Sequence, residues 1–165
     1  MPGLTVRLIH EDIKQLQAEA LIVGFHEDVR PLKGLAGELD WLLCGALSSL
    51  ILTNKLHGSL GDMALLTSQG KVPAQKIFLL GLGPKKGFTP AALHRAARNA
   101  AAGALDAGLT GAAIEYFPSA DVTHDHAVTA FYHGLNEGAA GRSFDVLMLA
   151  PDAGTYASIS RFFKA

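Results

Sequence analysis

The sequence predicts an α/β fold: a three-layer α/β/α arrangement around a mixed, mostly parallel sheet of about six strands. Residues 77–80, Ile-Phe-Leu-Leu, form an unbroken apolar run that is typical of a strand covered on both faces. Thr89 and Pro90 then open an alanine-rich helix whose apolar residues recur at helical spacing as far as Leu105, with Gly108 as its stop. Similar runs and stripes alternate along the rest of the chain, which favours parallel strands joined by helices.

The expected order of elements is ββαββαβαβα. The remaining expected strands are residues 4–9, 20–25, 63–67, 112–117 and 146–150. One long helix is expected from the apolar stripe between Leu35 and Leu50, another over residues 126–139, and a last one carrying Tyr156 and Phe162. No internal repeat or linker divides the chain, so a single domain over residues 1–165 is expected.

Composition narrows the function classes. The chain has 165 residues, 49% hydrophobic and 18% charged, which suits a compact protein with a large core. A net charge of −1 and a pI near 6.6 predict neither a nucleic-acid partner nor an anionic membrane partner. The acidic N-terminal segment and the lack of a long apolar run favour a cytoplasmic protein. The single cysteine, Cys44, excludes an internal disulfide.

Several short segments carry small and apolar residues near predicted strand ends and helix starts. They are residues 18–24 (Ala-Glu-Ala-Leu-Ile-Val-Gly), 34–40 (Gly-Leu-Ala-Gly-Glu-Leu-Asp), 58–61 (Gly-Ser-Leu-Gly), 78–83 (Phe-Leu-Leu-Gly-Leu-Gly) and 88–93 (Phe-Thr-Pro-Ala-Ala-Leu). As a set they resemble the non-catalytic N-terminal domain of the leucyl aminopeptidase family, itself a member of the wider macro-domain-like fold. The resemblance covers roughly residues 4–138 and implies that fold.

The C-terminal third and one early turn resemble plain macro domains. Residues 144–150 (Phe-Asp-Val-Leu-Met-Leu-Ala), followed by Tyr156 and Phe162, are similar to the closing strand and helix of that fold. Asp12-Ile13 matches the Asp-Ile that holds the adenine in ADP-ribose-binding macro domains. The resemblance therefore implies a ligand cleft to which Asp12 contributes.

Other parts of the macro-domain binding pattern differ in this chain. Residues 23–26 are Val-Gly-Phe-His where those proteins carry Asn-Ala-Ala-Asn, and their glycine triplet is reduced to Lys33-Gly34-Leu35. Their Ser-Thr-Gly phosphate loop is replaced by Pro118-Ser119-Ala120. These departures predict weak binding of ADP-ribose.

The aminopeptidase reaction does not carry over with the resemblance. In that family two metal ions sit in a separate C-terminal domain, held by lysine and acidic residues around an Asn-Thr-Asp-Ala-Glu-Gly-Arg-Leu motif. This sequence contains no such segment. Neither peptidase activity nor a cofactor is therefore expected.

A glycine pattern follows the central strand. Gly81-x-Gly83 and then Gly87 come near the dinucleotide fingerprint, but the third glycine falls one place late and Pro84 removes a backbone donor. A tight turn is the favoured interpretation, and nucleotide binding of the dinucleotide type the less favoured one. Lys85 and Lys86 either attract an anion at this loop or are simply solvated.

Two polar clusters are candidates for reactive sites. His124 and His126, with Asp121, form a weak candidate metal cluster, against the alternative that they simply begin a helix. Residues 26–28, His-Glu-Asp, follow a buried strand at the edge where open α/β sheets bind ligands, but no nucleophile lies nearby. We expect Cys44 to be a buried, inert thiol and Trp41 to be a packing residue.

Two functions from different classes remain. The first is a free-standing, non-catalytic macro-like domain that acts by binding a protein partner or a second copy of itself. The alternative is a small-molecule binder or hydrolase of the nucleotide or ADP-ribose type that uses the macro-type cleft. For the second, the ligand residues expected are Asp12, His26, Gly34, Gly81 and Gly83.

Overall fold

The computed structural model describes residues 3–117 and 122–163, in six strands, five α-helices and one short 3-10 helix. In chain order the elements are β1 (Leu4–Ile9), β2 (Ala20–Phe25), α1 (Gly34–Leu42), α2 (Ala46–Leu52), β3 (Met63–Thr67), β4 (Lys76–Gly81), α3 (Pro90–Asp106), β5 (Gly111–Glu115), α4 (His124–Ala139), β6 (Phe144–Leu149), α5 (Ala153–Ile159) and the 3-10 helix η1 (Ser160–Phe163). The predicted strands are all present. β5 ends two residues before the predicted end, and α4 begins two residues before the predicted start.

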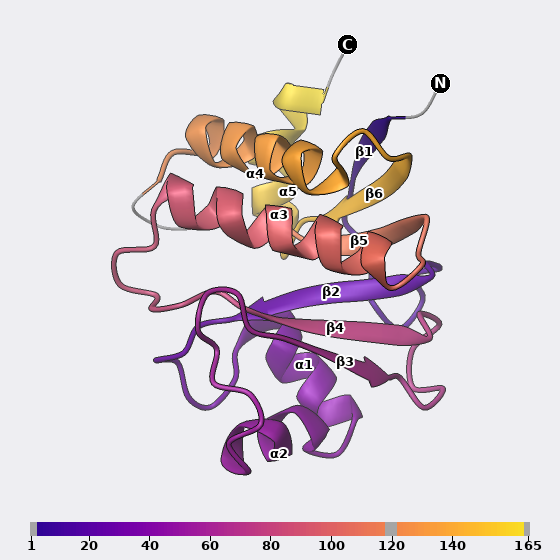
Figure 1. Ribbon diagram of the computed structural model, residues 1–165, viewed down its shortest axis with the longest axis vertical. Coiled ribbons are helices and arrows are strands. Elements are labelled where there is room, and N and C mark those ends of the chain that lie inside the picture. Colours follow the sequence, from indigo (N-terminus) through magenta and orange to yellow (C-terminus); the bar gives the residue numbers. More distant parts are fainter. Residues whose placement is uncertain (1–2, 118–121, 164–165) are drawn as a thin grey trace.

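The six strands form one sheet in the order β1-β6-β5-β2-β4-β3 (Figure 1). All neighbouring pairs are parallel except β3 and β4, which are antiparallel. β4 lies inside the sheet and its residues 77–80 are buried, which confirms the central strand read from the apolar run. The mixed, mostly parallel sheet of the predicted α/β fold is therefore confirmed.

Helices cover both faces of the sheet, and each face has its own core. On one face lie α3, α4 and α5, packed on alternate strand residues such as Ile22, Leu80 and Ile114. On the other face lie α1 and α2, packed on the residues between them, such as Val23 and Leu79. Strand side chains alternate between the two faces, so each strand contributes to both cores.

The alanine face of α3 rests on the sheet, as predicted. Thr89 caps the helix by accepting a hydrogen bond from the Ala92 N–H, and Pro90 is its first residue. The buried residues of this face are Leu93, Ala96, Ala97, Ala100, Ala101 and Ala104. Small side chains let the helix axis lie close to the strands and to its neighbour α4.

Glycines bring α4 into close contact with α3. A Cβ atom on Gly134 would lie 2.2 Å from the His94 carbonyl oxygen, and one on Gly138 would lie 2.3 Å from the Arg98 carbonyl oxygen. Both positions need glycine because the backbone of α3 occupies the space of a side chain. The two helices run side by side across the sheet (Figure 1).

The prediction of one long helix from Leu35 to Leu50 is wrong. The segment bends by 105° between α1 and α2. Cys44 and Gly45 at the bend have φ values of +56° and +84°, which no continuous helix allows. The Asp40 carboxylate accepts hydrogen bonds from the N–H of Ser48, at 2.9 Å, and from its hydroxyl, which fixes the start of α2.

Two side chains of this segment also differ from expectation. Cys44 is exposed at the bend rather than buried. Trp41 is 81% exposed, so it is not a packing residue in this chain. Trp41 lies on the side of α1 opposite the buried Ala36 and Leu39, and Cys44 lies at the bend itself. Among the described residues no single helix is long and apolar enough to span a membrane, and only the bent pair α1–α2 passes that test together.

Candidate functional site

The direction in which the chain adds strands to the sheet changes between β2 and β5. After β2 the chain turns to α1 on one face, and after β5 it continues to α4 on the other face. Open α/β sheets bind ligands at such a switch point, outside the carboxyl ends of the strands. The paired residues of β2 and β5 are only Leu21–Ala113 and Ile22–Ile114, so the two strands separate before their ends.

The side chain of Glu115 fills the opening between the separating strands. Its Oε1 atom accepts a hydrogen bond of 3.1 Å from the Gly24 N–H, in place of a strand carbonyl. The residue as a whole is partly exposed, while its carboxyl group is enclosed by neighbouring atoms. Burial raises the pKa of Glu115 to about 7, and the Gly24 hydrogen bond opposes that rise. Near neutral pH this carboxyl group is therefore partly protonated.

The loop after β2 is held against the loop after β4. The Gly83 carbonyl accepts a 3.1 Å hydrogen bond from the Glu27 N–H and lies 3.1 Å from Nδ1 of His26. The Asp28 carboxylate accepts a 2.9 Å hydrogen bond from the Lys85 N–H, which lowers the pKa of Asp28. Burial lowers the pKa of His26, and its hydrogen bond to Gly83 partly opposes this. The lowered pKa favours the neutral form of the imidazole.

A small cavity of about 110 Å³ lies at this loop pair. The side chains and backbone that line it are Gly24, Phe25, His26, Val29, Leu32, Lys33 and Lys85. The two lysines and the start of α1, where Lys33 is the N-cap residue, would favour an anionic group. The volume that the described residues enclose is below the 300–1,000 Å³ of typical small-molecule sites.

The structure brings together some of the predicted ligand residues. His26 lines the cavity, and Gly83, whose φ is +74°, contacts the His26 ring through its carbonyl oxygen. Gly34 begins α1 just after Lys33, with a φ of +59° and open space where a Cβ atom would be. Gly81 is instead a packing position, because a Cβ atom there would lie 2.2 Å from the Ser59 carbonyl oxygen.

Asp12 lies apart from these residues. It follows β1, and β6 and β5 stand between β1 and β2, so the two strand ends are roughly 14 Å apart at the usual strand spacing. Its carboxylate accepts a 2.9 Å hydrogen bond from the Lys14 N–H and pairs with the Lys14 ammonium at 3.6 Å. In this structure the Asp12 carboxylate stabilises the turn that begins at this residue.

The two histidines of the candidate metal cluster point in different directions. Nδ1 of His124 lies 3.1 Å from the Tyr116 hydroxyl, whose pKa burial raises to about 12. His126 lines an open hollow between α3 and α4 with His94 and His133. Residues two apart on a helix face different sides. Asp121 lies outside the described residues, and within residues 3–117 and 122–163 no three His, Cys, Asp or Glu side chains are grouped to hold a metal ion.

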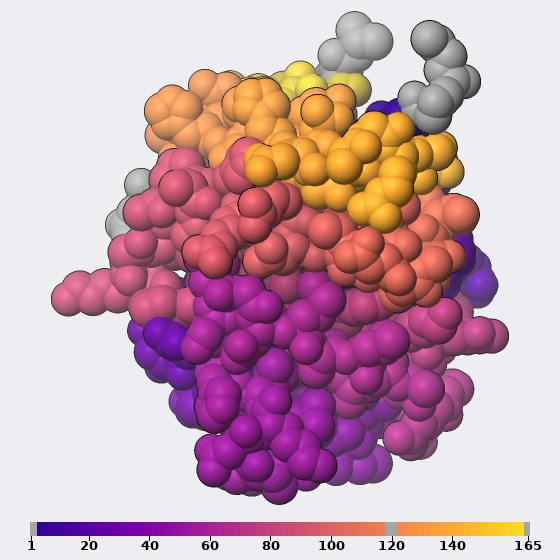
Figure 2. Space-filling model, viewed as in Figure 1, coloured from indigo at the N-terminus to yellow at the C-terminus, as the bar shows by residue number. Residues whose placement is uncertain are grey.

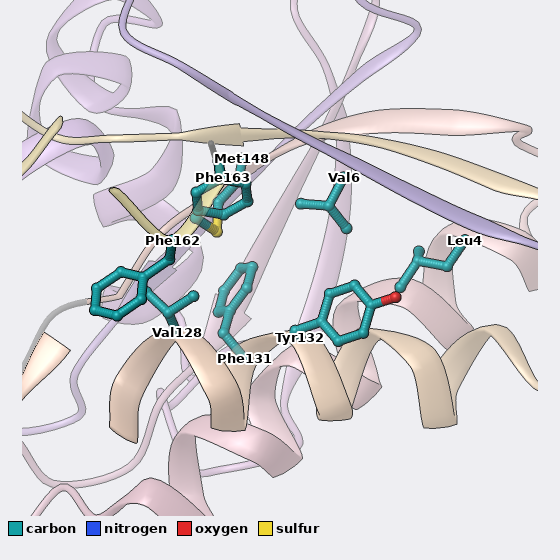
Figure 3. Close-up of a pocket in the computed structure, with 8 residues that line it drawn as sticks. All are labelled: Leu4, Val6, Val128, Phe131, Tyr132, Met148, Phe162 and Phe163. Atoms are coloured by element: carbon teal, nitrogen blue, oxygen red, sulfur yellow. The ribbon is translucent and has the colours of Figure 1, made fainter. Parts of the chain in front are cut away.

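A larger apolar cavity of about 290 Å³ lies beside β1. Figure 3 shows its lining residues, which come from β1, α4, β6 and η1: Leu4, Val6, Val128, Phe131, Tyr132, Met148, Phe162 and Phe163. Tyr132 contributes the one polar side-chain atom. Binding sites for small molecules combine an apolar wall with several converging polar groups, which this cavity lacks.

Glu115 is a residue of this site that no sequence pattern predicted. Its partner Gly24 is 91 positions away, and a single glutamate in an alternating strand usually faces water. The sequence contains one indication of its role. Ala112–Ile114 and Tyr116 are apolar, so both faces of the strand around Glu115 are expected to be buried.

Comparison with known proteins identifies the family. The model of the cytosol aminopeptidase family, N-terminal domain, matches residues 22–144. A probable cytosol aminopeptidase of Geobacter sulfurreducens is 33% identical over 141 residues, which are 85% of this chain and 28% of the relative. One from Alkaliphilus metalliredigens is 34% identical over 82 residues, 50% of this chain and 16% of the relative. The chain thus spans less than a third of the length of these relatives.

Solved structures share the fold at low sequence identity. A macrodomain of Oceanobacillus iheyensis superposes with a TM-score of 0.76 at 13% identity, over 96% of this chain and 90% of that one. A Trypanosoma brucei macrodomain in complex with ADP-ribose superposes with a TM-score of 0.73 at 15% sequence identity, over 96% of this chain and 69% of that one. Tomato leucine aminopeptidase gives 0.66 at 20% identity, over 96% of this chain and 35% of that one. With its macrodomain fold and its match over residues 22–144, this chain belongs to the cytosol aminopeptidase family, as a relative of that family's N-terminal domain.

Proposed function

We propose that this chain is a non-catalytic binding domain that acts through contacts with another polypeptide. The observation that carries this proposal is the exposure of two large apolar side chains on the α1–α2 pair, Trp41 at 81% and Leu52 at 82%. Tryptophan is enriched where proteins bind one another because it buries a large area with few rotatable bonds. We call the exposed residues of α1 and α2, which include these two, the α1–α2 surface.

The α1–α2 surface lies at one end of the molecule, away from α4 and the chain termini (Figures 1 and 2). Between Lys33 and Lys55 its only charged side chains are Glu38 and Asp40, and Asp40 is engaged with Ser48. A surface that is apolar and faintly acidic fits a polypeptide partner better than a nucleic acid or an anionic membrane. A cytoplasmic location belongs to the same proposal, supported by relatives named cytosol aminopeptidases.

The family match suggests which polypeptide to test first. In the Geobacter relative the matching region is 28% of the chain, so in that protein this domain is covalently joined to a longer remainder. The first candidate partner is therefore the part of a cytosol aminopeptidase that this chain does not span. We do not propose that this chain itself hydrolyses peptides, because its sequence does not contain the metal-binding motif of the family.

Gel filtration of the chain mixed with that part of an aminopeptidase tests the proposal. Co-elution is expected for the wild type and is expected to be lost when Trp41→Ser and Leu52→Ser are combined. Both side chains are in water in the free chain, so the double variant keeps its fold. Tyr132→Ser, a change of an exposed aromatic side chain on α4, is the matched control and should co-elute like the wild type.

A second candidate function has its own supporting observation. Lys33, Lys85 and His26 around the small cavity would suit a small anionic ligand at the carboxyl edge of the sheet. Calorimetric titration with ADP-ribose decides between the two. A dissociation constant in the micromolar range, which corresponds to a binding free energy of about −8 kcal/mol, would favour this second function. Absence of heat at millimolar ADP-ribose would favour the α1–α2 surface.

A further inference from the structure

The strand β3 ends the sheet, and no other described strand pairs with its outer edge. It pairs only with β4, and its sequence, Met-Ala-Leu-Leu-Thr, has neither a charge nor a proline. Proteins usually protect exposed edge strands with a lysine, a proline, a bulge or a covering segment. The opposite edge strand β1 carries Arg7 and is packed by η1, so the two edges of the sheet differ.

The alternation of hydrogen bonds between β3 and β4 shows which backbone groups of β3 point away from the sheet. The Gly81 N–H donates to the Asp62 carbonyl and the Ser68 N–H donates to the Gln75 carbonyl, each at 2.9 Å. In an antiparallel pair such bonded positions alternate, so Ala64 and Leu66 also face β4. The N–H and C=O groups of Met63, Leu65 and Thr67 therefore point away from the sheet. Within residues 3–117 and 122–163 no turn or loop hydrogen bond involves them.

Leu65 stands at the middle of this edge. It is 53% exposed, on the face of the sheet that carries α3, where the neighbouring side chain of Met63 packs against Gly103. In an antiparallel pairing of two β3 strands centred on Leu65, the two leucines are opposite each other and each Met63 is opposite a Thr67. All outward backbone groups of both strands are then satisfied, and two exposed leucines bury each other.

The ends of β3 also suit this arrangement. Asp62 precedes the strand, and Lys71 lies in the turn that follows it. Antiparallel pairing of two copies brings the acidic end of each strand toward the basic turn of the other, so the contact contains no like-charge pairing along the strand.

We propose that two copies of this chain associate through β3, antiparallel about Leu65, and join their two sheets into one. This rests on the proposed function in one respect, that the chain acts by contacts with polypeptides; it assigns one of those contacts to a second copy. An interface built mainly on one strand pair is small, so the dimer forms in a concentration-dependent way.

Sedimentation velocity of the purified full chain tests the proposal. The wild type is expected to shift from 17.3 kDa toward twice that mass as its concentration rises. Leu65→Lys is expected to stay a monomer throughout, because it places two charges opposite each other. Leu52→Lys, at a similarly apolar and more exposed position on α2, is the matched control and should dimerise like the wild type.

Two results would overturn the proposal: a wild type that is a monomer at every concentration, or a Leu65→Lys variant that dimerises as the wild type does. Hydrogen exchange gives an answer that needs no variant, since the Met63, Leu65 and Thr67 amides should exchange more slowly at high protein concentration. The proposed function is tested separately. Leu65→Lys should still co-elute with the aminopeptidase part, and the Trp41→Ser, Leu52→Ser pair should still dimerise.

Discussion

The two helical layers of this molecule cover one sheet in opposite ways. The α3–α4 layer uses alanine and glycine, so that helix backbone lies against helix backbone at Gly134 and Gly138. The α1–α2 layer uses leucines on its inner side and leaves Trp41 and Leu52 in water. One layer has no room for an additional methyl group, and the other exposes large side chains that the fold does not need.

This difference separates stability from binding. Close packing makes the α3–α4 layer intolerant of change, because a well-packed interior cannot absorb added volume. Side chains that contact nothing in the folded chain can change with little effect on stability. We therefore expect substitutions in the α3–α4 layer to affect folding, and substitutions on the α1–α2 surface to affect binding alone.

The largest effect is expected at the contact of α4 with α3. Gly134→Ala places a Cβ atom 2.2 Å from the His94 carbonyl oxygen and forces the helices apart. We expect a loss of about 3 kcal/mol in the free energy of unfolding, measured by urea denaturation. Gly3→Ala is the control, since a Cβ atom there meets nothing within 4 Å. Equal stability of the two variants would show that α3 and α4 are not in close contact.

A smaller effect is expected at Glu115, on the seam between the two halves of the sheet. Burial raises the pKa of Glu115 from the ordinary 4.5 of a glutamate to about 7 in the folded chain, so the folded state holds the proton more tightly. The free energy of unfolding should therefore fall as the pH rises from 4.5 through 7, by about 2 kcal/mol after allowance for partial exposure.

The Glu115→Gln variant isolates this effect. Glutamine keeps an oxygen that accepts the Gly24 hydrogen bond but does not titrate. Urea denaturation of both proteins at about pH 5 and about pH 8 should show a stability difference that grows in favour of the variant at the higher pH. A difference that is the same at both pH values would contradict an enclosed carboxyl group at this position.

The smallest effect on stability is expected at the α1–α2 surface. Trp41→Ser and Leu52→Ser should each change the free energy of unfolding by less than about 0.5 kcal/mol, because neither side chain is buried. Thermal unfolding of the single variants checks this. Destabilisation as large as that of Gly134→Ala would mean that these residues pack in the free chain, and the comparison of the two layers would fail.

The sequence predicted the fold better than the site. Strand runs such as residues 77–80 and the alanine face of α3 are local patterns with strong periodicity, and both are confirmed. The bend at Gly45 was missed because the leucine stripe continues in helical register across it, and only the φ values of Cys44 and Gly45 break the helix.

The candidate site depends on contacts that no local pattern reports. Glu115 meets Gly24 only because β2 and β5, far apart in the chain, separate at their ends. Gly81 was predicted as a ligand position but serves close packing against Ser59. The ligand roles predicted for Asp12, His26, Gly34 and Gly83 stay predictions, as does the metal role of His124 and His126.

The fluorescence of Trp41 tests the central claim most directly, because it is the only tryptophan in the chain. In the free protein its emission should be that of an indole in water and readily quenched by acrylamide. Addition of the aminopeptidase part that this chain does not span should shift the emission to shorter wavelength and protect it from quenching. Dimerisation through β3 centres on Leu65, which lies on the face of the sheet that carries α3 and not on the face that carries α1, so it should leave the Trp41 emission unchanged. Complex formation with no change in the Trp41 emission or its quenching would contradict binding at the α1–α2 surface.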